Sequence, residues 1–119
     1  MSIKSSISTI WEGVKELFRS IGRSIKKVVT QLLNFAKLVV QYFKEMYLNP
    51  ETDTPFIIDA EKLGEQIQNA PRVDVGIFEG VYHADTNSIS NYRIIEADQL
   101  DDDTKKVMSQ AKDGIAVLQ

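Results

Sequence analysis

The chain contains no cysteine, and no proline occurs before Pro50 among its 119 residues. The absence of cysteine excludes disulfides, thiolate metal ligands and cysteine nucleophiles, and it favours a reducing compartment. Only one histidine, His83, is present, so a metal site built on a pair of histidines is excluded as well. The absence of proline leaves the first 49 residues free to form a long helix.

Several functional motifs are also lacking. The sequence has no phosphate-binding loop, dinucleotide-binding fingerprint or nucleophile elbow, and we predict no cofactor, metal or small-molecule substrate. No secretory signal is visible, because Glu12, Lys15 and Glu16 interrupt the first apolar residues. Residues 28–47 form the most apolar stretch, but they include too many polar groups for a transmembrane helix. We therefore expect a cytoplasmic protein.

What the sequence does contain is an amphipathic helical pattern through its first 48 residues. Apolar side chains recur every three or four positions and fall within an arc of roughly 160° on a helical wheel. Gly13 and Gly22 each weaken a helix by about 1 kcal/mol, but the phase of the pattern continues through both. Because Pro50 disfavours helical geometry in the residue before it, the pattern predicts one helix from about residue 8 to residue 48.

Such a helix is too long for its own protein to cover. About 40 helical residues span about 60 Å, roughly twice the diameter of a domain of about 70 residues. About half of the apolar face would then need a partner outside the monomer, and we expect that partner to be a further copy or a larger protein assembly. The apolar spacing stays near 3.6 residues, which argues against a simple two-stranded coiled coil. The predicted interface residues are Trp11, Leu17, Phe18, Ile25, Leu32, Phe35, Val39 and Phe43.

Charge divides the chain into two unlike parts. Residues 1–48 carry eight lysines and arginines against three glutamates, a net +5, whereas residues 49–119 carry a net −8. This contrast favours head-to-tail contacts between copies.

A basic face formed by Arg19, Arg23, Lys26 and Lys27 also suits an anionic membrane surface, which is the main alternative to assembly. Nucleic acid is an improbable partner, because the acidic second part would repel it. A further alternative is that the helix folds back on itself around residues 20–24.

The predicted domain organisation is a helix over residues 1–48, a linker over 49–54 and a small acidic α+β domain over 55–119. In the last segment the patterns read strand, helix, strand, strand, helix, strand, which resembles the βαββαβ order of ferredoxin-like folds. The resemblance rests on element order alone. Residues 57–63 and 94–100 are similar to each other, as a twofold repeat would be. We expect Asp59 to cap a helix over 60–70, and an aspartate at 101–103 to cap one over 103–112.

Three groups of residues are candidate sites. His83 lies near the end of a predicted strand with Asp85 two residues further on, but an acid–base pair needs a third group and a pocket, and nothing nearby in the sequence supplies them. We therefore expect His83 to be a solvated or hydrogen-bonded structural histidine. The acidic residues 98–103 lack the spacing of a calcium loop and are better explained as helix-start carboxylates. Gly76 and Gly80 within one strand indicate a bulge or bend more than a ligand site.

Together these features favour a non-catalytic structural or adaptor protein that assembles through its N-terminal helix and displays a small acidic domain. The alternative is a peripheral membrane protein that lies in the membrane surface through the same helix. An enzyme would require His83 or the acidic cluster to belong to a site that spans subunits.

Overall fold

The computed structural model describes residues 7–22 and 24–118, and they form an α+β fold with one mixed sheet of five strands. The elements are α1 (Ile7–Ile21), β1 (Lys27–Leu33), the π-helix η1 (Ala36–Val40), α2 (Gln41–Lys44), β2 (Asp53–Asp59), α3 (Ala60–Gln66), β3 (Gly76–His83), β4 (Ser88–Leu100), α4 (Asp102–Ser109) and β5 (Ile115–Val117). The strands lie in the order β1-β4-β3-β2-β5. Only the β1–β4 pair is parallel among these described strands.

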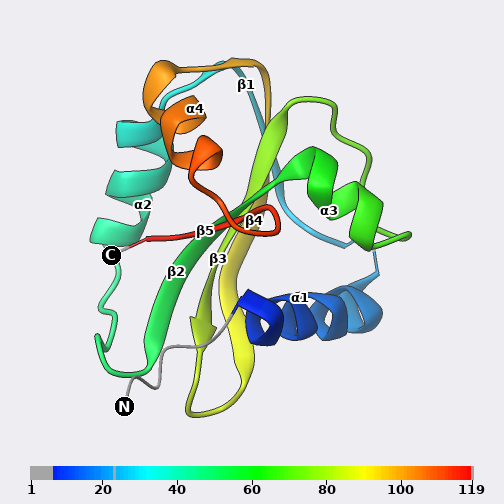
Figure 1. Ribbon diagram of the computed structural model, residues 1–119, viewed down its shortest axis with the longest axis vertical. Coiled ribbons are helices and arrows are strands. Elements are labelled where there is room, and N and C mark those ends of the chain that lie inside the picture. Colours follow the sequence, from blue (N-terminus) through cyan, green and yellow to red (C-terminus); the bar gives the residue numbers. More distant parts are fainter. Residues whose placement is uncertain (1–6, 23, 119) are drawn as a thin grey trace.

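Helices cover both faces of the sheet and make three layers (Figure 1). On one face α1 and α3 enclose a cluster that we call the α1-side core. On the other face η1, α2 and α4 enclose the α2-side core. Because side chains alternate along a strand, Phe56 and Ile58 of β2 enter the α1-side core while Ile57 enters the α2-side core. Burial on both faces explains why β3 is apolar almost throughout.

The predicted helix over residues 8–48 is wrong in its length. α1 ends at Ile21, and Gly22 follows with φ of 62° and its N–H donating to the carbonyl of Phe18 at 2.9 Å. A glycine in this left-handed conformation is a common helix end. The turn falls where the fold-back alternative placed it, but it leads into strand β1 rather than into a second helix.

Strand β1 forms because its residue types favour a strand, although the spacing of its apolar residues fits a helix. Val28, Val29 and Thr30 are β-branched, and such side chains favour strands. They pair with Ile95, Glu96 and Ala97 of β4 across more than 60 residues of sequence. The three-to-four-residue apolar spacing of the segment therefore did not determine its structure, because pairing with a distant strand outweighed a local pattern.

The elements after residue 53 follow the predicted sequence of strands and helices, but the ferredoxin-like order is not confirmed. The described chain has five strands and four α-helices, and β2 lies antiparallel and directly beside β3. A split βαβ arrangement would instead place another strand between these two. β2 also begins at Asp53, inside the segment 49–54 that was predicted as a linker. The predicted β3–β4 hairpin is present.

Candidate functional site

Most of the predicted interface residues lie inside the chain's own cores. Trp11 and Phe18 of α1 are buried against the sheet, as are Val39 of η1 and Phe43 of α2. Leu17, Ile25 and Phe35 are half-buried, whereas Leu32 on β1 is 42% exposed. The sheet itself thus covers much of the apolar stripe for which the sequence predicted an outside partner.

The predicted basic residues do not lie on one helical face. Arg19 is on α1 in an ion pair with Glu16, and Lys27 is on β1, with its Nζ 3.2 Å from Glu96 of β4. Lys26 is exposed in the connection between these elements, and Arg23 lies outside the described residues. No helix in the described ranges is both long enough and apolar enough to span a membrane.

An apolar groove of about 610 Å³ opens between α2, α4 and β5. Most of the residues that line it are apolar, and among these Val40 and Val117 are exposed, at 47% and 37%. The lining residues are Phe35, Val40, Phe43, Lys44, Leu48, Pro55, Val107, Gln110, Val117 and Leu118. The groove is larger than the two hollows of about 250 Å³ and 340 Å³ that residues of α3 line.

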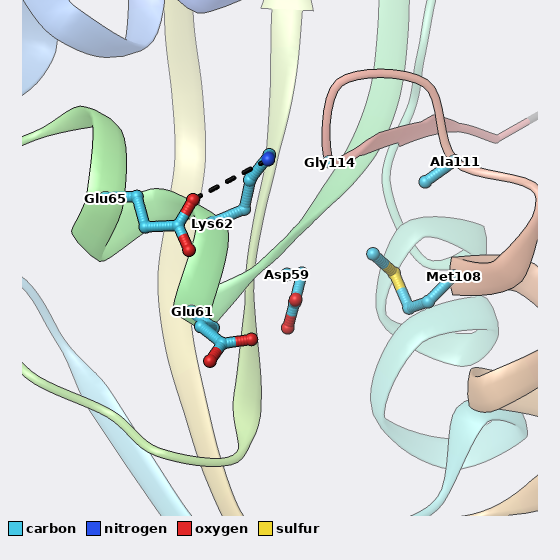
Figure 2. A pocket seen from close by; sticks show the side chains of 7 residues that line it. All are labelled: Asp59, Glu61, Lys62, Glu65, Met108, Ala111 and Gly114. Carbon is cyan, nitrogen blue, oxygen red and sulfur yellow. Dashed lines mark ion pairs between the residues drawn. The ribbon is translucent and has the colours of Figure 1, made fainter.

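A smaller hollow of about 250 Å³ lies on the other side of α4 (Figure 2). Asp59, Glu61 and Glu65 line it from the α3 side, and Met108 and Ala111 face them from the α4 side. Lys62 Nζ lies 3.6 Å from Glu65 Oε1, which offsets part of the negative charge. We therefore regard this hollow as a solvated charged surface.

A row of polar residues crosses the α2-side face of the sheet, beginning with a buried ion pair. Arg93 Nε donates to Glu79 Oε2 at 2.5 Å, and the same guanidinium donates to the carbonyl of Leu38 at 2.8 Å. It also lies 3.8 Å from the centre of the Tyr42 ring. Glu79 is fully buried, and its Oε1 has no hydrogen-bond partner among the described residues. Burial raises the pKa of Glu79 to about 7, although Arg93 acts to lower it.

A β-bulge continues this polar row towards the end of the sheet. The β3–β4 register changes between the pairs Glu79–Arg93 and Val81–Ser90, which leaves one extra residue in β4. Asn91 has φ of 52° at this point, a conformation that asparagine tolerates, and its carbonyl accepts the Tyr42 hydroxyl at 2.9 Å. Because of the extra residue, Ser90 and Arg93 face the same side of the sheet.

Next to the bulge, three side chains from three strands form a hydrogen-bonded relay. Asp53 of β2 and His83 of β3 are directly opposite each other, and His83 Nδ1 lies 2.7 Å from Asp53 Oδ1. His83 Nε2 lies 2.5 Å from the Oγ of Ser90 on β4. Their side chains are partly accessible, at 25% for His83 and 11% for Asp53.

Asp53 is held as a carboxylate by its surroundings. Burial acts to raise its pKa, but hydrogen bonds from the Asn49 N–H, His83 and the Thr52 hydroxyl outweigh this and lower it. An ionised Asp53 accepts a hydrogen bond donated by the N–H at His83 Nδ1. The arrangement therefore fixes which ring nitrogen carries the proton, as an oriented general base requires.

Together with Asp53 and His83, Asp85 forms a group of side chains that could hold a metal ion. Its carboxylate and the ligand atoms of Asp53 and His83 all lie within 4.8 Å of one another, and Asp85 is exposed. One imidazole and two carboxylates are ligands that a zinc ion accepts. Of the pair of His83 and Asp85 that the sequence analysis considered, His83 belongs to the relay and Asp85 lies beside it. Sequence reasoning missed Asp53 and Ser90, which no motif or spacing marked.

The other candidates have structural roles. Asp101 caps α4, with its Oδ1 accepting the Thr104 N–H at 2.9 Å, whereas Asp102 and Asp103 are exposed in the first turn. A Cβ atom at Gly76 would lie 2.1 Å from the carbonyl oxygen of Ile95, so this glycine permits a close backbone approach. Gly80 lies opposite the bulge.

Comparisons with protein-family models, with curated proteins and with solved structures found no match to this chain.

Proposed function

We propose that this protein is a structural or adaptor protein that associates with a second copy of itself through the apolar groove. The observation that carries the proposal is the groove itself, where Val40 and Val117 are exposed beside Phe35, Leu48 and Leu118. A contiguous apolar surface of this kind is typical of an interaction site, whereas single exposed apolar residues are not. The groove takes the place of the long helical face, because α1 and α2 use their apolar residues in the two cores.

A lysine in the lining and the glutamate next to it in the sequence favour a second copy as the occupant. Lys44 lines the groove and Glu45 follows it, both exposed, and Lys44 makes no ion pair within the part of the chain that the structure describes. In a twofold interface the same surface meets itself, so each contact occurs twice in reciprocal form. Neighbouring opposite charges allow Lys44 of each copy to face Glu45 of the other, around an apolar centre.

Sedimentation equilibrium over a range of protein concentrations tests this proposal. We expect a reversible dimer in the wild type, and an increase of about tenfold or more in the dimer dissociation constant for Val40→Asp and for Val117→Asp. The matched control is Val29→Asp. Val29 is 70% exposed on β1 and lies outside the groove, so its replacement should leave the dimer unchanged.

Two results would contradict association between copies. One is a wild type that stays monomeric at every concentration, and the other is an equal effect of all three substitutions. Flotation with anionic vesicles should be run on the same proteins. Vesicle binding by a monomeric wild type that Val40→Asp abolishes would favour the peripheral membrane alternative, with the groove in contact with lipid.

A further inference from the structure

We propose that Ser90, His83 and Asp53 form a nucleophilic relay that hydrolyses small, activated carboxylic esters. This activity is independent of the apolar groove. It rests on three residues from three adjacent strands. His83 lies between the other two, with its Nε2 2.5 Å from Ser90 Oγ and its Nδ1 2.7 Å from Asp53 Oδ1. Serine, histidine and aspartate linked in this order are recognised by geometry and by role, not by position in a sequence.

The first step of the argument is the state of the imidazole. The Asp53 carboxylate lies 2.7 Å from Nδ1 and offers it only an acceptor, so a neutral His83 ring has its proton on Nδ1 and a free electron pair on Nε2. Nε2 lies 2.5 Å from Ser90 Oγ, where its electron pair can take the hydroxyl proton during attack. A weakly acidic hydroxyl becomes a useful nucleophile when a positioned base removes its proton during attack.

The second step concerns how rigidly the three groups are held. Asp53 and His83 are a cross-strand pair in the β2–β3 ladder, and the register of β4 after its bulge brings Ser90 alongside. Asp53 is further held by the Asn49 N–H, which donates to its Oδ2 at 2.8 Å. Groups placed on strands are positioned more accurately than groups on loops. β-bulges often redirect a side chain beside an active site.

The third step is access and competition at Ser90. Ser90 and His83 are only partly buried, so a small ester can reach the hydroxyl. Asn91 Oδ1 lies 2.8 Å from the same Oγ and offers the hydroxyl a second acceptor. The proton of Ser90 is therefore shared between an amide oxygen and His83 Nε2, and only the second contact activates the oxygen.

The reaction proceeds in two balanced halves. Ser90 Oγ forms a bond to the carbonyl carbon of the ester while His83 Nε2 takes the hydroxyl proton, and the ester C–O bond then breaks. The proton passes from His83 to the departing alcohol. In the second half a water molecule attacks the acyl-serine as His83 takes one of its protons. That proton returns to Ser90 Oγ, and a carboxylic acid is released.

A fluorophosphonate probe followed by peptide mass spectrometry tests the nucleophile directly. In the folded protein we expect a covalent phosphonyl group on Ser90, with loss of fluoride, and no labelling after Ser90→Ala. His83→Gln should slow the labelling by about 100-fold, because it removes the base. The matched control is Ser88→Ala. Ser88 pairs with His83 in the strand register but bonds to Thr86, and its loss should leave the rate unchanged.

A second measurement tests the same base with a thiol in place of the serine hydroxyl. Since the chain has no cysteine, Ser90→Cys and Ser88→Cys each create a single thiol. Alkylation by iodoacetamide should be at least about tenfold faster at position 90, and His83→Gln should abolish the difference. Asp53→Asn should lower kcat for p-nitrophenyl acetate with little change in KM, because the amide would reverse the ring tautomer.

Three results would overturn the relay. They are the absence of a Ser90 adduct in protein shown by its unfolding curve to be folded, labelling that His83→Gln leaves unchanged, and equal alkylation at positions 88 and 90. Ester hydrolysis that a chelator abolishes would also overturn it, because the activity would then belong to a metal held by Asp53, His83 and Asp85.

Discussion

Glu79 is the residue whose environment conflicts most with its chemistry. It is fully buried in the α2-side core, where one carboxylate oxygen pairs with Arg93 and the other has no partner in the described chain. Removing a charge from water costs free energy that a single partner repays only in part. The raised pKa of this carboxyl, about 7, reflects that cost, with burial as the largest cause.

This shift predicts that the protein loses stability as the pH rises towards neutrality. The folded-state pKa of about 7 lies above the ordinary value of 4.5, so the folded state binds this proton more tightly than the unfolded state does. The resulting stabilisation is complete below pH 4.5 and is lost as the pH rises through about 7. Its size is on the order of 3 kcal/mol. Urea unfolding followed by fluorescence of Trp11, the only tryptophan, should show the decrease.

Glu79→Gln should remove this decrease, because the amide does not titrate. The matched control is Glu96→Gln, which removes a partly exposed glutamate 3.2 Å from Lys27 and should keep the pH dependence. A wild type whose unfolding free energy is constant across this range would contradict the assignment. The two aspartates with lowered pKa values, Asp53 and Asp101, act in the opposite direction at lower pH, where protonation removes their contribution.

At the scale of elements, Asp101 joins two segments with one carboxylate. Its Oδ1 accepts the Thr104 N–H at 2.9 Å and the Thr104 hydroxyl at 2.5 Å, which caps α4. Its Oδ2 accepts the Phe35 N–H at 2.8 Å, at the start of η1. The side chain thus satisfies backbone donors at the beginnings of two helices that pack on the same face of the sheet.

Asp101→Ala should therefore lower the free energy of unfolding by about 2 to 3 kcal/mol, more than an ordinary cap, because two buried or half-buried donors lose their acceptor. Asp102→Ala and Asp103→Ala are matched controls, since both side chains are exposed in the same turn and should change stability by less than about 0.5 kcal/mol. Urea unfolding at neutral pH measures all three. Equal effects at the three positions would contradict the double cap.

The elements that could be predicted from sequence are those with local signals. α3 and α4 begin after Asp59 and Asp101, close to the predicted starts, and the turn chemistry at 85–88 marked the β3–β4 hairpin. β1 could not be predicted, because its partner lies far along the chain and its apolar residues also fit a helix. Gly22 adopts φ of 62° after α1, but a helical pattern that continues in phase through a glycine does not show whether the helix ends there.

The relay could not be predicted for a similar reason. Asp53 and His83 are 30 residues apart, and the distance between them depends on the β2–β3 register. Ser90 reaches His83 only because the bulge near Asn91 adds one residue to β4. Since a shift of one residue turns every side chain of a strand to the other face, no spacing in the sequence could identify this site.

At the scale of the whole molecule, the apolar stripe of the first 48 residues is divided among several elements, and the sheet covers each part separately. The described chain extends 39 × 29 × 24 Å, which leaves no room for a helix of about 60 Å. α1 packs on one face of the sheet and the η1–α2 segment on the other, with β1 between them as an edge strand (Figure 1). The basic first part and the acidic second part are likewise interleaved in one body, as the pair of Lys27 and Glu96 illustrates.

This interleaving predicts that the fragment of residues 49–119 does not fold alone. It would lose Trp11, Phe18, Val39 and Phe43 from the two cores, and at about 2 to 3 kcal/mol each this loss approaches the whole stability of a small domain. The full chain should unfold in urea in a single transition, whereas the fragment should show no cooperative transition by circular dichroism.

Adding a separate peptide of residues 1–48 should restore a cooperative transition, because both cores then regain their missing side chains. The matched control is the same peptide with Phe18→Asp and Phe43→Asp, one change in each core, which should fail to restore it. A fragment that folds by itself with a normal transition would mean that residues 55–119 are an independent domain, and that the N-terminal segment is an appendage packed on its surface.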